Sequence, residues 1–150
     1  MPNTPAMVGE AMSALCPNEN VTDDEVCVVK EIFESFGVAE VVSEALIDAV
    51  IGISGSSPAY VYMFIEAMAD AAVIGGMPRA KAYTFAAQAV LGSAKMVLET
   101  GIHPGQLKDM VCSPGGTTIE AVAELERQGM RSAVIEAVKV CMDKSRKMSK

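Results

Sequence analysis

SPAYVYMFIEAMADAAVIGG, residues 57–76, decides how this chain folds. A proline at the first helical position and a closing glycine pair predict a helix from Pro58 to Gly75. Glu66 and Asp70 are its only charged residues, so this helix has no polar face to turn toward water. They lie one turn apart, and we expect solvated or paired charges there rather than a catalytic carboxylate pair.

The next predicted helix has the same property. It runs from Pro78 to Thr100, stops at Gly101, and carries charges only near its ends. The few remaining elements of a small chain cannot enclose two such helices, and both fall short of the ~20 apolar residues of a membrane span. We therefore expect burial against a second copy of the chain. Small residues on the second helix would permit close approach of backbones: Ala86, Ala87, Ala89, Gly92, Ser93 and Ala94.

The rest of residues 43–150 is also predicted to be helical. Ser43 caps a helix ending near Ile53, a short helix follows Pro104, and two more span Gly116–Gln128 and Arg131–Lys147. This part is predicted as a helical dimerisation and substrate domain.

Residues 1–42 have a different pattern, that of a small α/β piece. Short strands are predicted at Ser13–Cys16 and Val38–Val42. Between them, Thr22 and Glu25 form a capping box that starts a helix running to Phe36 and stopping in a left-handed residue at Gly37. The predicted fold class is thus mainly α: a helical bundle forming an interleaved dimer, preceded by a two-stranded α/β remnant of a truncated Rossmann domain.

Composition excludes several function classes. The formal charge of −7, with no basic stripe, argues against binding nucleic acid. The N-terminus shows no secretion signal, so we expect a cytoplasmic protein whose four cysteines are free, buried thiols. We expect no metal site, because the only histidine, His103, has no second ligand at helical spacing.

SPGGTT, residues 113–118, is the strongest candidate binding site. Its two glycines let a ligand approach the backbone closely, and two threonines begin the following helix. Unpaired N–H groups and the positive end of the helix dipole favour a small anion such as a carboxylate there. The alternative is an ordinary helix start with no ligand.

Several longer motifs occur in one order along the chain. They are MPNTPA (residues 1–6), ISGSSPAY (53–60), FIEAMADA (64–71), AAQAVLGSAKMVLETG (86–101) and HPGQLKDMVCSPGGTTI (103–119). From Ile53 to Lys144 the chain resembles the C-terminal domain of pyrroline-5-carboxylate reductases, and its first residues are similar to the end of that family's nucleotide-binding domain.

The resemblance implies a reaction and a site. In the family, NADPH (or NADH) delivers a hydride to the C=N carbon of 1-pyrroline-5-carboxylate, which gives L-proline in the last step of proline biosynthesis. It implies a homodimer or a higher oligomer. The residues implied for substrate binding are Ser113, Gly115, Gly116, Thr117 and Thr118, with Thr118 catalytic through the ring nitrogen; those implied beside the cofactor are Asn3, Thr4, Ser56 and Pro58.

Two departures from the family pattern bear on activity. The sequence contains no G-x-G-x-x-G turn to cradle a dinucleotide pyrophosphate. We therefore expect a fragment that is inactive by itself. The second departure is Ser57, which stands where the family commonly has a glycine and adds a side chain near the expected hydride path. Two other functions stay open: a non-catalytic dimerisation module, and a related two-domain dehydrogenase acting on another small acid.

Overall fold

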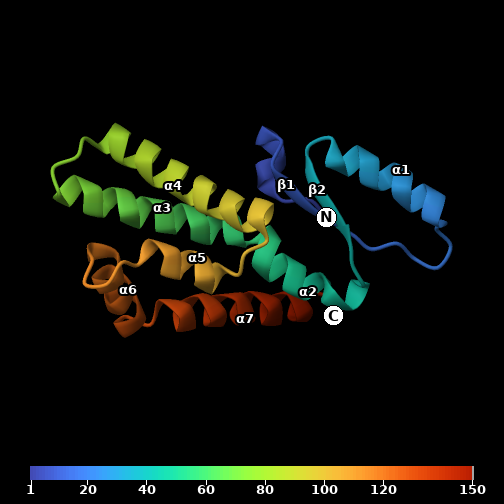
Figure 1. The fold of residues 1–150 in the computed structure, drawn as a ribbon. Coiled ribbons are helices and arrows are strands. Elements are labelled where there is room, and N and C mark those ends of the chain that lie inside the picture. The colour runs from blue at the N-terminus through green and yellow to red at the C-terminus, as the bar shows by residue number, and fades with distance from the viewer. Residues whose placement is uncertain (150) are drawn as a thin grey trace. The chain divides into compact units, whose positions relative to one another are not determined.

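The computed structural model describes residues 1–149, so that Lys150, the last residue of the predicted helical domain, lies outside the described part. Its elements follow the predicted order (Figure 1). They are η1 (Thr4–Val8), β1 (Ala11–Leu15), α1 (Asp23–Glu34), β2 (Gly37–Val41), η2 (Glu44–Leu46), α2 (Ile47–Val50), η3 (Ile51–Gly55), α3 (Ser57–Ile74), α4 (Arg79–Thr100), α5 (Pro104–Val111), α6 (Thr117–Arg127) and α7 (Met130–Met148). The predicted class, a mainly helical chain with a small α/β piece, is confirmed.

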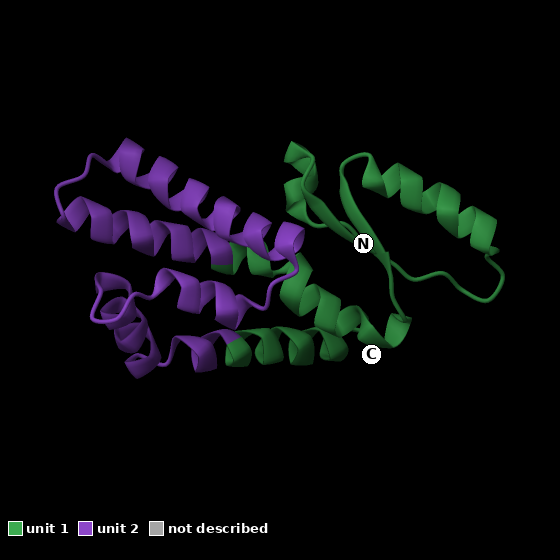
Figure 2. Ribbon diagram, viewed as in Figure 1, with its two compact units in different colours: residues 1–60, 135–150 green, residues 61–134 purple. Residues whose placement is uncertain are grey.

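The chain divides into two compact units (Figure 2). One unit combines residues 1–60 with the C-terminal residues from Ile135 onward, and the other holds residues 61–134. Two helices, α3 and α7, each have residues in both units. The domain boundary expected after residue 42 stays a prediction.

The first unit contains a parallel β1–α1–β2 arrangement. β1 pairs with β2 from Ala11 opposite Gly37 to Leu15 opposite Val41. The predicted capping box is present: Thr22 Oγ1 accepts from the Glu25 amide at 3.3 Å, and Glu25 Oε2 accepts from the Thr22 amide at 2.9 Å. The hydrogen bonds that the Glu25 carboxylate accepts from the Thr22 amide and the Thr22 hydroxyl lower the pKa of the Glu25 carboxyl.

The prediction that Gly37 ends α1 in a left-handed conformation is wrong. The helix ends at Glu34 with Ser35 as its right-handed cap, and Gly37 is the first residue of β2. Gly37 has φ +157°, and a Cβ built on it would collide with the backbone nitrogen and oxygen of Ala11. Glycine is therefore required at this position by the close approach of β1 rather than by a helix end.

The second edge of β1 is also paired, by the first residue of the chain. The Met1 amino group donates to the Ala14 carbonyl at 2.5 Å, and the Ala14 amide donates to the Met1 carbonyl at 3.1 Å. This reciprocal pair is antiparallel. Met12 is half-buried, and the other residues of β1 are buried. β1 thus has the burial of an interior strand.

The prediction of one continuous helix from Ser43 to Ile53 is wrong, because the segment is divided into three short helical elements. Ser43 does cap a helical turn, through its Oγ and the Ala45 amide at 3.3 Å. The segment then passes through η2 and α2 into η3, a π-helical turn closed by a 2.8 Å bond from the Ser56 amide to the Ile51 carbonyl. The two glycines of η3 weaken the α-helical preference there, and such turns recur at functional sites.

In the second unit, the helix faces of α3 and α4 are largely open to solvent. The buried residues of these two helices are Ala69, Ala82 and Ala86. Large apolar side chains stay exposed: Met63 is 69% exposed, Phe85 66% and Leu98 81%. Asp70 forms an ion pair with Arg79 of the same chain, and both side chains are exposed.

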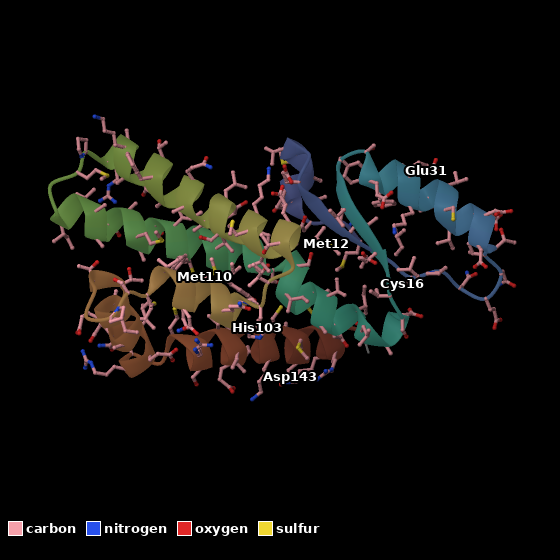
Figure 3. The ribbon with its side chains drawn as sticks, viewed as in Figure 1. Met12, Cys16, Glu31, His103, Met110 and Asp143 are labelled. Carbon is pink, nitrogen blue, oxygen red and sulfur yellow. The ribbon has the colours of Figure 1, made fainter. Side chains whose placement is uncertain are left out.

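The four cysteines are free, as predicted, but the prediction that they are buried is wrong. Cys16 (Figure 3) and Cys27 are exposed, and Cys112 and Cys141 are half-buried. Among residues 1–149, no helix combines the length and the hydrophobicity that a membrane span needs.

We expect Gly37→Ala to destabilise the first unit. The added methyl group meets the Ala11 backbone, which cannot move without breaking the β1–β2 register. A loss of roughly 2 kcal/mol or more in the free energy of unfolding is expected from such overpacking. Urea unfolding followed by circular dichroism measures it. Gly9→Ala is the matched control, because Gly9 also has positive φ but open space around it; equal losses in both variants would contradict the steric explanation.

Candidate functional site

The residues predicted for the site fall into two groups, one in each unit. Ser113 to Thr118 belong to the second unit, while Asn3, Thr4, Ser56 and Pro58 belong to the first. Each group is described within its own unit.

The Ser113–Gly116 segment forms a tight turn before α6. The Gly116 amide donates to the Ser113 carbonyl at 3.0 Å, and Gly115, at φ +65°, follows Pro114. A proline and then a residue of positive φ are what a type II turn requires. A Cβ on Gly116 would collide with the Ser113 hydroxyl oxygen, so that oxygen lies against the Gly116 backbone. Glycine is therefore required at position 115 by the backbone, while at position 116 it leaves room for the Ser113 side chain.

The start of α6 presents its amides without a side-chain cap. Gly116 is the N-cap residue, has extended geometry, and makes no side-chain capping bond. The first helical amides, those of Thr117, Thr118 and Ile119, cannot pair within the helix. The Gly116 amide differs from them, because the turn already uses it.

The threonine side chains differ in exposure. Thr117 is exposed, and Thr118 is half-buried. One acidic residue, Glu120, lies in the first turn of α6 and opposes a bound anion in part. The arrangement suits one small anion held by backbone N–H groups and a threonine hydroxyl.

In the first unit, Asn3 is bonded to two separate segments of this chain. Its Oδ1 accepts from the Met12 amide at 3.0 Å. Its Nδ2 donates to the Ser54 carbonyl at 3.2 Å and to the Ser54 hydroxyl at 3.4 Å. The polar atoms of Asn3 are thus engaged by β1 and by the π-helical turn.

Ser56 lies beside two groups that the predicted site did not include, Tyr60 and Cys141. Its hydroxyl and the Cys141 thiol are 3.1 Å apart. Burial raises the pKa of the Tyr60 phenol, and Cys141 raises it further. Tyr60 could have been included from the sequence, since it closes the ISGSSPAY motif. Cys141 could not, because a cysteine in an amphipathic helix normally indicates core packing. These residues line a cavity of about 670 Å³ together with Lys144 and Ser145.

The remaining residues of this group are less enclosed. Thr4 is exposed at the start of η1, and Pro58 is half-buried in the first turn of α3. The Ser57 hydroxyl donates to the Ile53 carbonyl at 2.7 Å, so this serine, which replaces a family glycine, is bonded back to its own turn.

The first-unit residues form a polar surface that could serve at most as one wall of a cofactor site. The polar atoms of Asn3 and Ser56 are held in place by internal hydrogen bonds, which suits a fixed wall. The sequence supplies no glycine-rich turn for a pyrophosphate.

His103, the histidine considered as a metal ligand, has a structural role. It precedes α5 (Figure 3), and its Nδ1 accepts from the Gly105 amide at 3.1 Å. It is therefore the N-cap of that helix. Within residues 1–149, no three side chains of His, Cys, Asp or Glu gather in a way that could hold a metal ion.

Comparison with known proteins identifies relatives over the whole chain. The pyrroline-5-carboxylate reductase of Escherichia coli (strain K12) is 68% identical over 150 residues, which are all of this chain and 56% of that protein. The pyrroline-5-carboxylate reductase of Methanosarcina acetivorans is 51% identical over the same share of each chain. This chain thus spans little more than half the length of the curated relatives it matches.

A solved structure shows the same fold with a nicotinamide cofactor. The pyrroline carboxylate reductase of Plasmodium falciparum, crystallised with NADP bound, superposes with a TM-score of 0.92 at 38% identity, over all of this chain and 60% of that one. Residues 44–148 match the family model described as pyrroline-5-carboxylate reductase dimerisation. This chain therefore belongs to the pyrroline-5-carboxylate reductase dimerisation family.

Proposed function

We propose that this chain is the dimerising and substrate-binding part of a pyrroline-5-carboxylate reductase. The observation that carries the proposal is the α6 start, where a glycine-shaped turn leaves helical amides uncapped within a domain of this family. The 68% identity with a reductase over the whole chain supports the same reaction.

The substrate carboxylate would bind at the Ser113–Thr118 turn. Amides of Thr117 and Thr118 point out of the helix end, and the dipole favours negative charge there. Because the Gly116 amide is already bonded to Ser113, Gly116 and Gly115 serve by allowing close approach. The Ser113 hydroxyl, whose oxygen lies close to Gly116, is a further side-chain donor in this turn.

Thr118 would act on the ring nitrogen. NADPH, or NADH, supplies the hydride that reduces the C=N carbon, and the nitrogen gains a proton as the imine becomes an amine. A hydroxyl beside that nitrogen can donate a hydrogen bond as its basicity rises. The half-buried position of Thr118 suits this role better than the exposed Thr117.

The cofactor would meet this chain at the first-unit wall. Thr4 and Pro58 have accessible surface, and Asn3 and Ser56 have side chains fixed by internal bonds. The pyrophosphate would be held by a glycine-rich turn outside these residues. The free cysteines support a location in the reducing cytoplasm.

The partner would be a second copy of this chain. Exposed apolar side chains on α3 and α4, with a groove of about 480 Å³ beside small residues of α4, support a symmetric helical interface. The family's description as a dimerisation domain supports it as well.

The chain is expected to sediment as a dimer at micromolar concentration. Burial of the exposed faces of α3 and α4 is the driving force. Leu98→Lys places a charge on one such face and should shift the equilibrium toward monomer, while Lys95→Arg, one turn earlier, should not. Sedimentation of the unchanged chain as a folded monomer would contradict the expected interface.

By itself, the chain should bind NADPH with a Kd above about 1 mM. The wall residues offer few contacts without a pyrophosphate cradle, and such affinity corresponds to only about 4 kcal/mol. Isothermal titration calorimetry measures this. Micromolar binding would mean that the cofactor site lies elsewhere on this chain.

Turnover tests the reaction itself, in a chimera where this chain replaces the matching 150 residues of the Escherichia coli reductase. The chimera should reduce the imine with NADPH. Thr118→Val removes a hydroxyl at nearly constant volume and should lower kcat on the order of tenfold to hundredfold, the range for losing a critical hydrogen bond.

Thr84→Val is the matched control, because Thr84 is exposed on α4 with its hydroxyl bonded to the Ala80 carbonyl. It should leave kcat unchanged. An inactive, folded chimera would favour a non-catalytic dimerisation module, and an equal loss in both threonine variants would reject the role of Thr118.

A further inference from the structure

The two hydrogen-bonding ends of Asn3 join segments far apart in sequence. Oδ1 accepts from the Met12 amide on β1, and Nδ2 donates to Ser54 in η3, 51 residues away. Met12 lies on β1 (Figure 3). The opposite amide orientation would place an NH₂ group against the Met12 N–H and an oxygen against the Ser54 carbonyl. Both contacts would be repulsive, so the surroundings fix one orientation.

The π-helical turn that Asn3 contacts is also held by α7. A Cβ on Gly52 would lie 3.0 Å from Val138 Cγ1 and 3.3 Å from Met142 Cγ, so the turn packs closely against that helix. Gly52 and Ser54 are the buried residues of the turn. The turn is therefore fixed at Gly52 by packing and at Ser54 by hydrogen bonds.

The position of this turn determines where the following residues begin. The Ser56 amide closes the π turn on the Ile51 carbonyl at 2.8 Å, and the Ala59 amide bonds to the Ser56 carbonyl at 3.1 Å. A π turn holds one residue more than an α-helical turn. Relaxing it to α geometry would rotate Ser56 and Pro58 by about 100° around the helix, one residue's share of a turn.

We propose that Asn3 is a positioning residue, which locks the π turn against β1 and so sets the backbone of Ser56–Pro58. Its effect on turnover rests on the proposed function, while the lock itself rests on contacts within one unit of this chain. Asparagine suits the role because one planar group carries both an acceptor for Met12 and a donor for Ser54. Aspartate keeps the acceptor and loses the donor.

The lock is tested in this chain alone, without cofactor or substrate. In Asn3→Asp, amide hydrogen exchange measured by NMR should be roughly tenfold faster at Ser56 and Ala59, as expected from losing one or two neutral hydrogen bonds. Exchange in α1 should stay unchanged. Asn20→Asp is the control, since Asn20 is an exposed residue of the loop before α1 in the same unit.

Unchanged exchange at Ser56 and Ala59 would overturn the proposal and leave Asn3 as a residue that acts only by touching a ligand. Uniformly faster exchange through α1 as well would also overturn it, because the role would then be general stability. If both Asn3→Asp and Asn3→Ser, which has a smaller side chain, unfolded the chain, the proposal would also be overturned, because Asn3 would then serve general stability.

The consequence for the reaction is tested in the chimera. Asn3→Asp should raise KM for NADPH several-fold and leave KM for the imine unchanged, because the displaced turn belongs to the cofactor wall. A raised KM for the imine instead would overturn the positioning role. An inactive chimera would count against the proposed function while the exchange result still decides the lock.

Discussion

The absence of a polar face on α3 and α4 is the constraint on which the rest of this structure depends. A single chain buries only alanines along these helices, and leaves Met63, Phe85 and Leu98 in contact with water. Exposed apolar area of this kind is unfavourable in proportion to its size. The proposed assembly with a second copy would bury this area, and the family model that the chain matches is described as a dimerisation domain.

Around this helical part, two local devices fix the candidate site residues, each within its own unit. At α6 the turn is shaped by glycines: Gly115 adopts positive φ, and Gly116 leaves room for the Ser113 hydroxyl. In the first unit, the π turn is bonded to β1 through Asn3 and packed on α7 through Gly52. Both devices rely on backbone groups and small residues, which hold a defined geometry with little freedom to adjust.

Sequence patterns predicted most of the helices because caps and breakers are local signals. The Thr22–Glu25 capping box, Pro58 and Gly101 all mark real helix ends. The π turn was missed because the contacts that hold it come from distant residues: Val138 of α7 packs on Gly52, 86 residues away, and Asn3 bonds to Ser54, 51 residues away. Gly37 was misassigned for a similar reason: the group that requires glycine there is the backbone of Ala11, which local chemistry does not reveal.

The candidate site was predictable in its residues and only partly in its bonding. SPGGTT predicted a helix start, but the hydrogen bond of the Gly116 amide within its own turn follows from the folded geometry and not from the motif. Likewise, MPNTPA and ISGSSPAY marked Asn3 and Ser56, while their partners Met12 and Cys141 belong to patterns that indicate ordinary packing. The hydrogen-bond partners of Asn3 and Ser56 are distant in sequence, so a single sequence does not reveal them.

The uncapped start of α6 also limits how the protein can evolve or be engineered. Aspartate, serine or asparagine at an N-cap normally strengthens a helix by about 1 kcal/mol, so a stability-driven redesign would choose one at position 116. Any of them would displace the Ser113 hydroxyl and engage the amide of Thr118 or Ile119. If the proposed anion site is used, selection for thermal stability and selection for an accessible site oppose each other at this one position. Mutational tolerance measured by folding alone would then misjudge it.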